Sequence, residues 1–164
     1  MSQSSDSENN SSYQQELPMR GHGFLIYFSL WAGAVSVVFS AFRLFTGMDY
    51  TQGGLSLDYV YGMYPSLRTV SVVFGAIFLG MAAFTIYTRF QLAGLKSGAP
   101  GKLTVVYILN IVLTLLYAMA LAGALGIGVT ELLDGSIVGQ FIGSAAMAIV
   151  NGIYYSKRSH LFVN

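Results

Sequence analysis

The sequence predicts an all-α integral membrane protein: an antiparallel, up-down-up-down four-helix bundle that follows a disordered N-terminal tail. Three observations lead to this fold class. Of the 164 residues, 54% are hydrophobic and only 9% are charged, whereas soluble domains carry about 25% charged residues. The few charges leave four long intervals free of Asp, Glu, Lys and Arg. The loops between these intervals differ in charge, which predicts an orientation for the bundle.

Residues 1–20 are predicted to form a disordered polar tail, because the segment is rich in Ser, Asn and Gln. A cleaved signal peptide is the competing interpretation of this end of the chain. Such a peptide needs a basic start and an apolar segment of about 7–15 residues. This chain instead begins with acidic residues and continues into a longer apolar run. The four-helix domain is therefore expected over residues 21–164, with its first apolar interval retained as a helix.

Each charge-free interval is long enough to cross a membrane. An α-helix rises about 1.5 Å per residue, so about 20 residues cross a hydrocarbon core of about 30 Å. The most apolar parts of the intervals predict spans at 24–42, 70–87, 103–124 and 137–155. The runs are continuous rather than alternating, and a backbone in lipid must satisfy its own hydrogen bonds, so helices are expected rather than barrel strands.

Charged residues in the short loops predict the orientation. Two segments carry cations without acids, one between the second and third spans and one after the fourth: Arg89, Lys96, Lys102, Lys157 and Arg158. The two other loops carry the acids Asp49, Asp58, Glu131 and Asp134. Because basic loops stay inside, a multi-pass cell-membrane protein with both termini cytoplasmic is expected. The five cations are candidate contacts for anionic lipid headgroups.

Two amides within the predicted spans form a candidate interhelical polar pair. Asn110 lies eight residues from Lys102, about 12 Å along its helix, and Asn151 lies six residues from Lys157, about 9 Å along its helix. The two helices are antiparallel, so the amides are expected at similar depth, facing the bundle interior. An interhelical hydrogen bond there would contribute about 0.6–2 kcal/mol. Packing is favoured over a substrate site as the role of this pair.

Four charges near the predicted outer ends of the first two spans form a candidate outer-face cluster: Arg43, Asp49, Asp58 and Arg68. Arg43 lies close to a hydrocarbon span, where an unpaired arginine is costly unless it reaches the interface. The functional interpretation is a site for an anion or a lipid headgroup. The structural interpretation, which is favoured, is snorkelling or an ion pair that closes the first helical hairpin.

Catalytic and metal-binding patterns are not found in the sequence. It has no cysteine and two histidines, and it lacks the P-loop, GxGxxG, HExxH and GxSxG patterns. No catalytic, cofactor-binding or metal-binding residues are therefore predicted, and no cofactor is expected. The net charge of +1 argues against nucleic acid as a partner. The expected partners are membrane lipids, with a second copy of the chain or another membrane protein as candidates.

Two segments carry a resemblance to known proteins. They are Tyr87–Lys96, followed by Gly98, Pro100 and Leu103, and the ending Tyr154–Arg158 with Phe162. Together they resemble small four-helix membrane proteins of Gram-positive bacteria and, more distantly, an uncharacterised bacterial family. Some of these relatives carry a zinc ribbon before the first helix, and a chain without cysteine cannot form one. The resemblance implies a four-helix fold and the bacterial inner membrane, but no activity.

The function expected from these observations is that of a non-enzymatic integral membrane interaction or accessory protein. The alternative is a small oligomeric transporter or channel, and a lipid-modifying enzyme is a weaker third hypothesis without a visible catalytic pair. The centre of the bundle distinguishes the first two. A polar cavity lined by Asn110, Asn151, Ser36 or Gln140 would favour transport. A centre packed with Gly and Ala would favour the accessory role.

Overall fold

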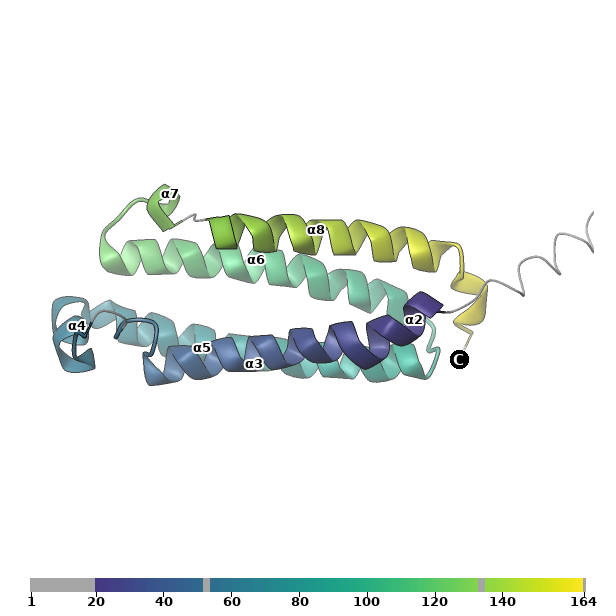
Figure 1. The fold of residues 1–164 in the computed structure, drawn as a ribbon, viewed down its shortest axis with the longest axis horizontal. Helices are drawn as coiled ribbons and strands as arrows, with labels where there is room; N and C mark the ends of the chain where they lie inside the picture. Colours follow the sequence, from purple (N-terminus) through teal and green to yellow (C-terminus); the bar gives the residue numbers. More distant parts are fainter. Residues whose placement is uncertain (1–19, 52–53, 133–134, 164) are drawn as a thin grey trace, which may run out of the picture.

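The computed structural model describes residues 20–51, 54–132 and 135–163, and within these ranges the chain forms helices and no strands. Four helical segments are long and apolar enough to cross a membrane: Gly21–Thr46, Pro65–Ala93, Ala99–Leu125 and Ile137–Ser156. The predicted all-α fold with four membrane-spanning helices is therefore confirmed (Figure 1). The predicted tail lies outside the described residues, apart from Arg20.

The first crossing is one helix with an internal change of register. It comprises α2 (Arg20–Phe24), the π-helix η1 (Leu25–Ser29) and α3 (Leu30–Thr46). It ends at Gly47, whose φ of +65° is the left-handed conformation that glycine adopts at helix ends. The amide of Met48 then donates to the carbonyl of Arg43 at 3.1 Å. This turn returns the chain across the end of α3.

The second crossing begins after a short helix, α4 (Leu57–Met63), whose N-terminus is capped by Ser56 Oγ accepting from the Tyr59 amide at 3.3 Å. The long helix α5 (Pro65–Ala93) follows, with its proline in the first turn, where no amide donor is needed. It exceeds the predicted span at both ends, because its polar first and last turns continue the helix beyond the apolar interval.

The third and fourth crossings form the second hairpin. Helix α6 (Ala99–Leu125) starts after Gly98 and ends at Gly126, both in the left-handed conformation. The short α7 (Val129–Leu132) leads to α8 (Gly135–Ser156), and the 3-10 helix η2 (Ser159–Leu161) follows it.

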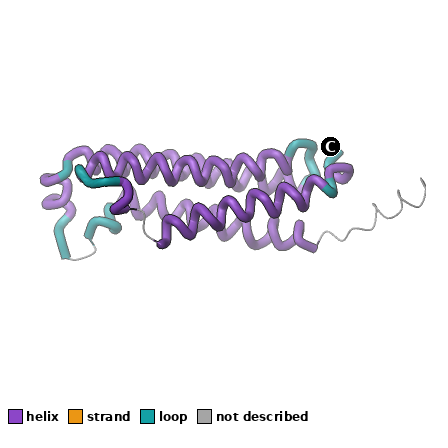
Figure 2. The backbone as a smooth tube through the Cα atoms, turned by 90° about the horizontal axis from the view of Figure 1, so that it is seen from above, coloured by secondary structure: helices purple, strands orange, loops and turns teal. Residues whose placement is uncertain are grey.

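Packing follows chain order, with α3 against α5, α5 against α6, and α6 against α8. Figure 1 shows the α3–α5 pair as one layer and the α6–α8 pair as the other, and Figure 2 shows the long helices running along the length of the molecule. Arg20, the C-terminus and the α5–α6 loop lie at the same end of the bundle (Figure 1). This end is called here the terminal end. The opposite end, which carries α4 and α7, is called the distal end. The two layers converge at the terminal end and diverge toward the distal end (Figure 1).

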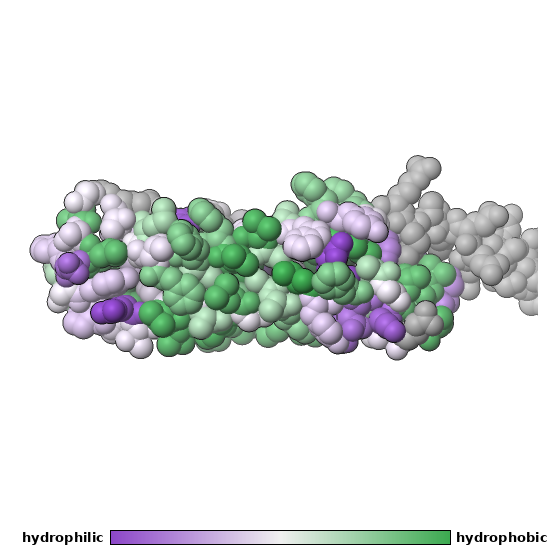
Figure 3. Space-filling view, turned by 90° about the horizontal axis from the view of Figure 1, so that it is seen from below, coloured by the Kyte–Doolittle hydropathy of each residue, from purple (hydrophilic) through white to green (hydrophobic). Residues whose placement is uncertain are grey.

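A cluster of buried side chains lies at the terminal end, where all four crossings meet. Its members are apolar or aromatic: Leu25, Ile26, Leu30, Leu92, Ala99, Leu103, Tyr155 and Phe162. On the face seen in Figure 3, the surface between the two ends is apolar, and polar residues gather at each end. Such a belt fits a multi-pass membrane protein whose helices are surrounded by lipid.

Candidate functional site

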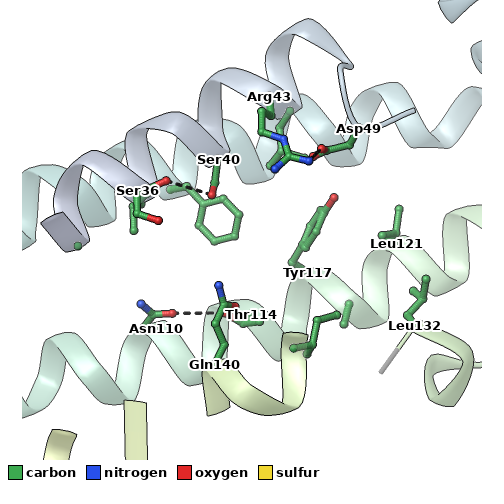
Figure 4. Close-up of a pocket in the computed structure, with 16 residues that line it drawn as sticks. Ser36, Ser40, Arg43, Asp49, Asn110, Thr114, Tyr117, Leu121, Leu132 and Gln140 are labelled. Atoms are coloured by element: carbon green, nitrogen blue, oxygen red, sulfur yellow. Dashed lines mark hydrogen bonds and ion pairs between the residues drawn. The ribbon is translucent and has the colours of Figure 1, made fainter. Parts of the chain in front are cut away.

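A cavity of about 400 Å³ lies between the two layers, toward the distal end. Helices α3, α6 and α8 line it with hydrogen-bonding side chains, and the loop after α3 adds the carboxylate of Asp49. The polar lining residues are Ser36, Ser40, Arg43, Asp49, Asn110, Thr114, Tyr117 and Gln140 (Figure 4). Apolar side chains complete the walls, among them Val37, Leu44, Phe78, Leu121 and Ile137. This mixture of apolar walls and a few converging polar groups is typical of a small-molecule site.

An ion pair between Arg43 and Asp49 lies at the distal edge of the cavity. The turn at Gly47 holds the pair in place, since it brings Asp49 back over the last turn of α3. A methyl group on Gly47 would lie 2.9 Å from the Tyr61 hydroxyl and also against Leu57. The pair therefore depends on a turn that only glycine fits beneath α4.

The predicted outer-face cluster of four charges is divided by the structure. Arg43 and Asp49 form the ion pair, whereas Asp58 and Arg68 are exposed in the first turns of α4 and α5. Neither of these two takes part in an ion pair with another described residue. Only the first two of the four charges belong to the cavity.

A chain of hydroxyl groups lies beside the ion pair and joins α5 to α6 through the loop after α3. Ser71 Oγ donates to the Leu67 carbonyl at 2.8 Å, and the Tyr50 hydroxyl lies 2.8 Å from Ser71 Oγ and 3.4 Å from the Tyr117 hydroxyl. Each hydroxyl has one proton, so Tyr50 donates to Ser71 and Tyr117 donates to Tyr50. The Tyr117 oxygen therefore keeps lone pairs that can accept a hydrogen bond from a ligand.

Deeper in the cavity, hydroxyl protons are used within the helices. Ser40 Oγ donates to the Ser36 carbonyl at 3.1 Å, and Thr114 Oγ1 donates to Asn110 Oδ1 at 3.4 Å. Serine and threonine commonly bond to their own helix in this way. The Asn110 NH₂ group is not used in this bond, and the Gln140 side chain of α8 rises into the cavity beside Thr114 (Figure 4).

The two amides of the predicted interhelical pair have separate partners. Asn151 is buried and donates to the Met147 carbonyl at 2.7 Å and to the Tyr107 hydroxyl at 3.5 Å. Asn110 lies in the cavity lining. The two amides differ in depth by about 3 Å, about half a helical turn, whereas Tyr107 lies about 7.5 Å from Lys102 along α6, closer to the 9 Å depth of Asn151. Asn151 thus fastens α6 to α8, and Asn110 faces the cavity instead.

Aromatic residues at the terminal end pack the helices together and separate the cavity from that end of the bundle. His22 Nδ1 and the Tyr155 hydroxyl share a hydrogen bond of 2.9 Å, and the His22 amide donates to the Tyr154 hydroxyl at 3.2 Å. The Phe162 ring lies edge-on to Tyr155, with centroids 5.4 Å apart. Together with the buried leucines around them, these residues join the first crossing to the last at the terminal end, so the cavity ends within the bundle.

Three of the five predicted headgroup contacts lie over aromatic rings at the terminal end. Arg89 Nε donates to the carbonyl of Ile26, within the π-helix, at 3.2 Å, and its guanidinium lies 5.1 Å from the Trp31 ring centroid. Lys102 Nζ lies 4.9 Å from the Tyr87 ring centroid, and the Arg158 guanidinium lies 3.9 Å from that of Tyr154. The two remaining cations, Lys96 and Lys157, are exposed.

The residues that sequence reasoning missed are those of the hydroxyl chain. Tyr50, Ser71 and Tyr117 come from three separate segments, and nothing in their spacing brings them together. In the part of the chain that the structure describes, no group of three or more His, Cys, Asp or Glu side chains could hold a metal ion. Comparison of the whole chain with known protein families, with curated proteins and with solved structures finds no match.

Proposed function

We propose that this chain is a non-enzymatic membrane protein that binds a small polar or amphipathic molecule in the cavity between its helix layers. The observation that carries the proposal is the convergence of polar side chains from α3, α6 and α8 on one space of about 400 Å³. Small-molecule sites measure about 300–1,000 Å³. Polar groups within a membrane-spanning bundle are costly unless they have partners, so their gathering at one cavity favours a ligand site over packing.

A binding role agrees better with the lining than catalysis does. Among the described residues that line the cavity, Asp49 supplies the one carboxylate, and it is paired with Arg43. A general base must be free to take a proton from a substrate, and the remaining polar groups are hydroxyls and amides. These groups recognise a ligand through hydrogen bonds without transforming it.

Transport is the second candidate, and one specific observation favours it. Of the four side chains whose convergence would indicate a transport path, Ser36, Asn110 and Gln140 line the cavity, whereas Asn151 lies beyond it. A path across the membrane would then require the contacts of His22 and Tyr155 at the terminal end to open. A cavity closed at one end is one state of an alternating-access carrier.

The cellular location and membrane orientation proposed for this protein are those that the sequence predicts. We place the protein in a bacterial cell membrane, with the terminal end cytoplasmic and the distal end outside. Lys96 and Lys157 are exposed at the terminal end and would contact anionic headgroups at about 1 kcal/mol per cation. A second copy of the chain or another membrane protein is proposed to pack against the lipid-facing surface of the bundle.

Cysteine accessibility tests the cavity, and a chain without cysteine is a ready background for it. Thr114→Cys and Ser40→Cys place thiols in the cavity lining, and Leu116→Cys places one on the exposed apolar face of α6. A charged, membrane-impermeant thiol reagent added from outside the cell should label the first two and spare the third, because the thiolate forms in water and not in lipid. Equal labelling of all three, or labelling of none, would contradict a water-accessible cavity.

The same assay addresses transport. Val106→Cys lies in α6, buried on the terminal side of the cavity, and should stay unlabelled if the site only binds. Labelling of Val106→Cys from both sides of the membrane, together with Thr114→Cys, would favour the transport candidate.

A further inference from the structure

The Arg43–Asp49 pair gives the cavity two opposite charges side by side at its distal edge. Both side chains are accessible, with exposed fractions of 38% for Arg43 and 29% for Asp49. In Figure 4, Arg43 lies above Ser40, and Asp49 lies on the side of the Tyr117 hydroxyl. The Ser40 proton already goes to the Ser36 carbonyl. Arg43 is therefore the donor on one side of this edge, and the Asp49 carboxylate and the Tyr117 oxygen are the acceptors on the other.

The balance of the two charges restricts which ligand can enter. An anion bound to Arg43 would displace Asp49 and leave its carboxylate without a partner, and a cation bound to Asp49 would do the same to Arg43. Although part of each side chain is accessible, the carboxylate oxygen in the pair, Asp49 Oδ1, is buried, and leaving a buried charged atom without its partner is unfavourable. A ligand that carries both charges can insert between the two side chains and provide a partner for each.

From this geometry, we propose that the cavity takes a zwitterion, with an oxyanion bound to Arg43 and an ammonium group bound to Asp49. The inference rests on the proposed binding function and names its ligand class. The ammonium would also donate to the Tyr117 oxygen, whose own proton goes to Tyr50. The uncharged remainder of the ligand lies along Thr114, Asn110 and Gln140, where hydroxyl and amide groups line the cavity.

Two sources supply this chemistry. A zwitterionic lipid headgroup would enter sideways between the two helix layers, with its acyl chains against the apolar outer surface. A free zwitterion would enter from the aqueous phase at the distal end. The cavity of about 400 Å³ holds a headgroup or a small free molecule but not a whole phospholipid, so both routes lead to the same contacts.

Binding measurements on the purified full chain in neutral detergent can test the assignment. The zwitterionic probes are dihexanoyl phosphatidylethanolamine and its free headgroup, glycerophosphoethanolamine. Their anionic counterparts are dihexanoyl phosphatidylglycerol and glycerophosphoglycerol. The wild-type protein should prefer the zwitterionic member of a pair by about tenfold or more in Kd, a difference of about 1.4 kcal/mol. Binding of the lipid probe alone identifies a membrane headgroup as the source, and binding of the free probe as well identifies an aqueous one.

Charge variants show whether the ion pair causes the preference. Asp49→Asn frees the Arg43 charge and should shift the preference toward the anionic probe. Arg43→Gln should weaken binding of both probes. The double exchange Arg43→Asp with Asp49→Arg restores an ion pair and should retain zwitterion binding. It is the variant to use where the single variants are unstable. Asp58→Asn is the matched control, since Asp58 lies exposed on α4, outside the cavity.

Equal affinity for both charge types, no binding of the zwitterionic probes, or a preference that survives Asp49→Asn would overturn the assignment. Thr114→Leu, which fills the cavity, separates this failure from that of the proposed function. If the wild-type protein shows no preference for the zwitterionic probes and Thr114→Leu abolishes binding of both charge types, the cavity remains a ligand site and only the zwitterion assignment is wrong. If no probe binds, the zwitterion is also wrong, and the cysteine labelling decides whether the cavity admits solutes. Probe binding that Thr114→Leu leaves unchanged would refute the cavity as the site.

Discussion

Replacement of Gly47 with alanine should destabilise the protein for two reasons that can be separated. The residue has a φ of +65°, and the left-handed conformation costs a residue with a side chain about 1–2 kcal/mol. The added methyl group would also press against Leu57 and the Tyr61 hydroxyl, and overpacking costs about 1–3 kcal/mol. The expected loss in the free energy of unfolding is therefore about 2–5 kcal/mol.

Gly126→Ala is a matched control for this experiment. Gly126 also ends a membrane-spanning helix, with a φ of +71°, but a methyl group there would meet no atom within 4 Å. Its loss should be the conformational part alone, about 1–2 kcal/mol. Unfolding in mixed micelles with increasing SDS, followed by circular dichroism, measures both variants. Equal losses would refute the packing of α4 over Gly47 and, with it, the account of how Asp49 reaches Arg43.

Three further predictions concern the contacts that hold the helices together. Asn151→Leu should lower the free energy of unfolding by about 0.6–2 kcal/mol, because it removes an interhelical hydrogen bond. Asn110→Leu should change the free energy of unfolding by less than about 0.5 kcal/mol. Equal effects in the SDS titration would contradict the separate roles of the two amides. Arg89→Ala should cost about 1.5–3 kcal/mol, the value of a hydrogen bond to a charged group, while the exposed Lys96→Ala should stay within about 0.5 kcal/mol in the same titration. Tyr155→Phe should cost about 0.5–1.5 kcal/mol through loss of the bond to the first crossing and speed proteolysis at the terminal end; wild-type rates would show that this bond does not hold the end closed.

The helices could be predicted from the sequence because the bilayer leaves the backbone no other choice. An apolar interval of sufficient length must be helical, so the spacing of charges located all four crossings. The ends of the helices were less predictable: α5 extends to Pro65 and Ala93, since polar residues at the interface continue a helix as well as apolar ones do. The sequence does not indicate the π-helix at Leu25–Ser29, whose register depends on what packs against it.

The cavity could not be predicted, because it depends on how far the two layers diverge. Sequence spacing estimates the depth of a residue along its helix but not the rotation or tilt of that helix, which neighbouring helices set. This explains why Asn151 meets Tyr107 rather than Asn110. It also explains why Tyr50 and Tyr117 could not be recognised: tyrosines near a membrane surface are usually anchors, and only the fold joins these two to Ser71.

The π-helix also fixes the direction in which the start of the first crossing faces. A π-helical turn amounts to one residue inserted into an α-helix, and each residue of an α-helix turns the chain by about 100°. Loss of one residue from η1 would swing His22 about a quarter-turn around the helix axis, away from Tyr155, while α3 and its cavity residues stayed in place. The extra residue therefore lets a single helix face two different neighbours, α8 at the terminal end and α5 along the remainder of its length.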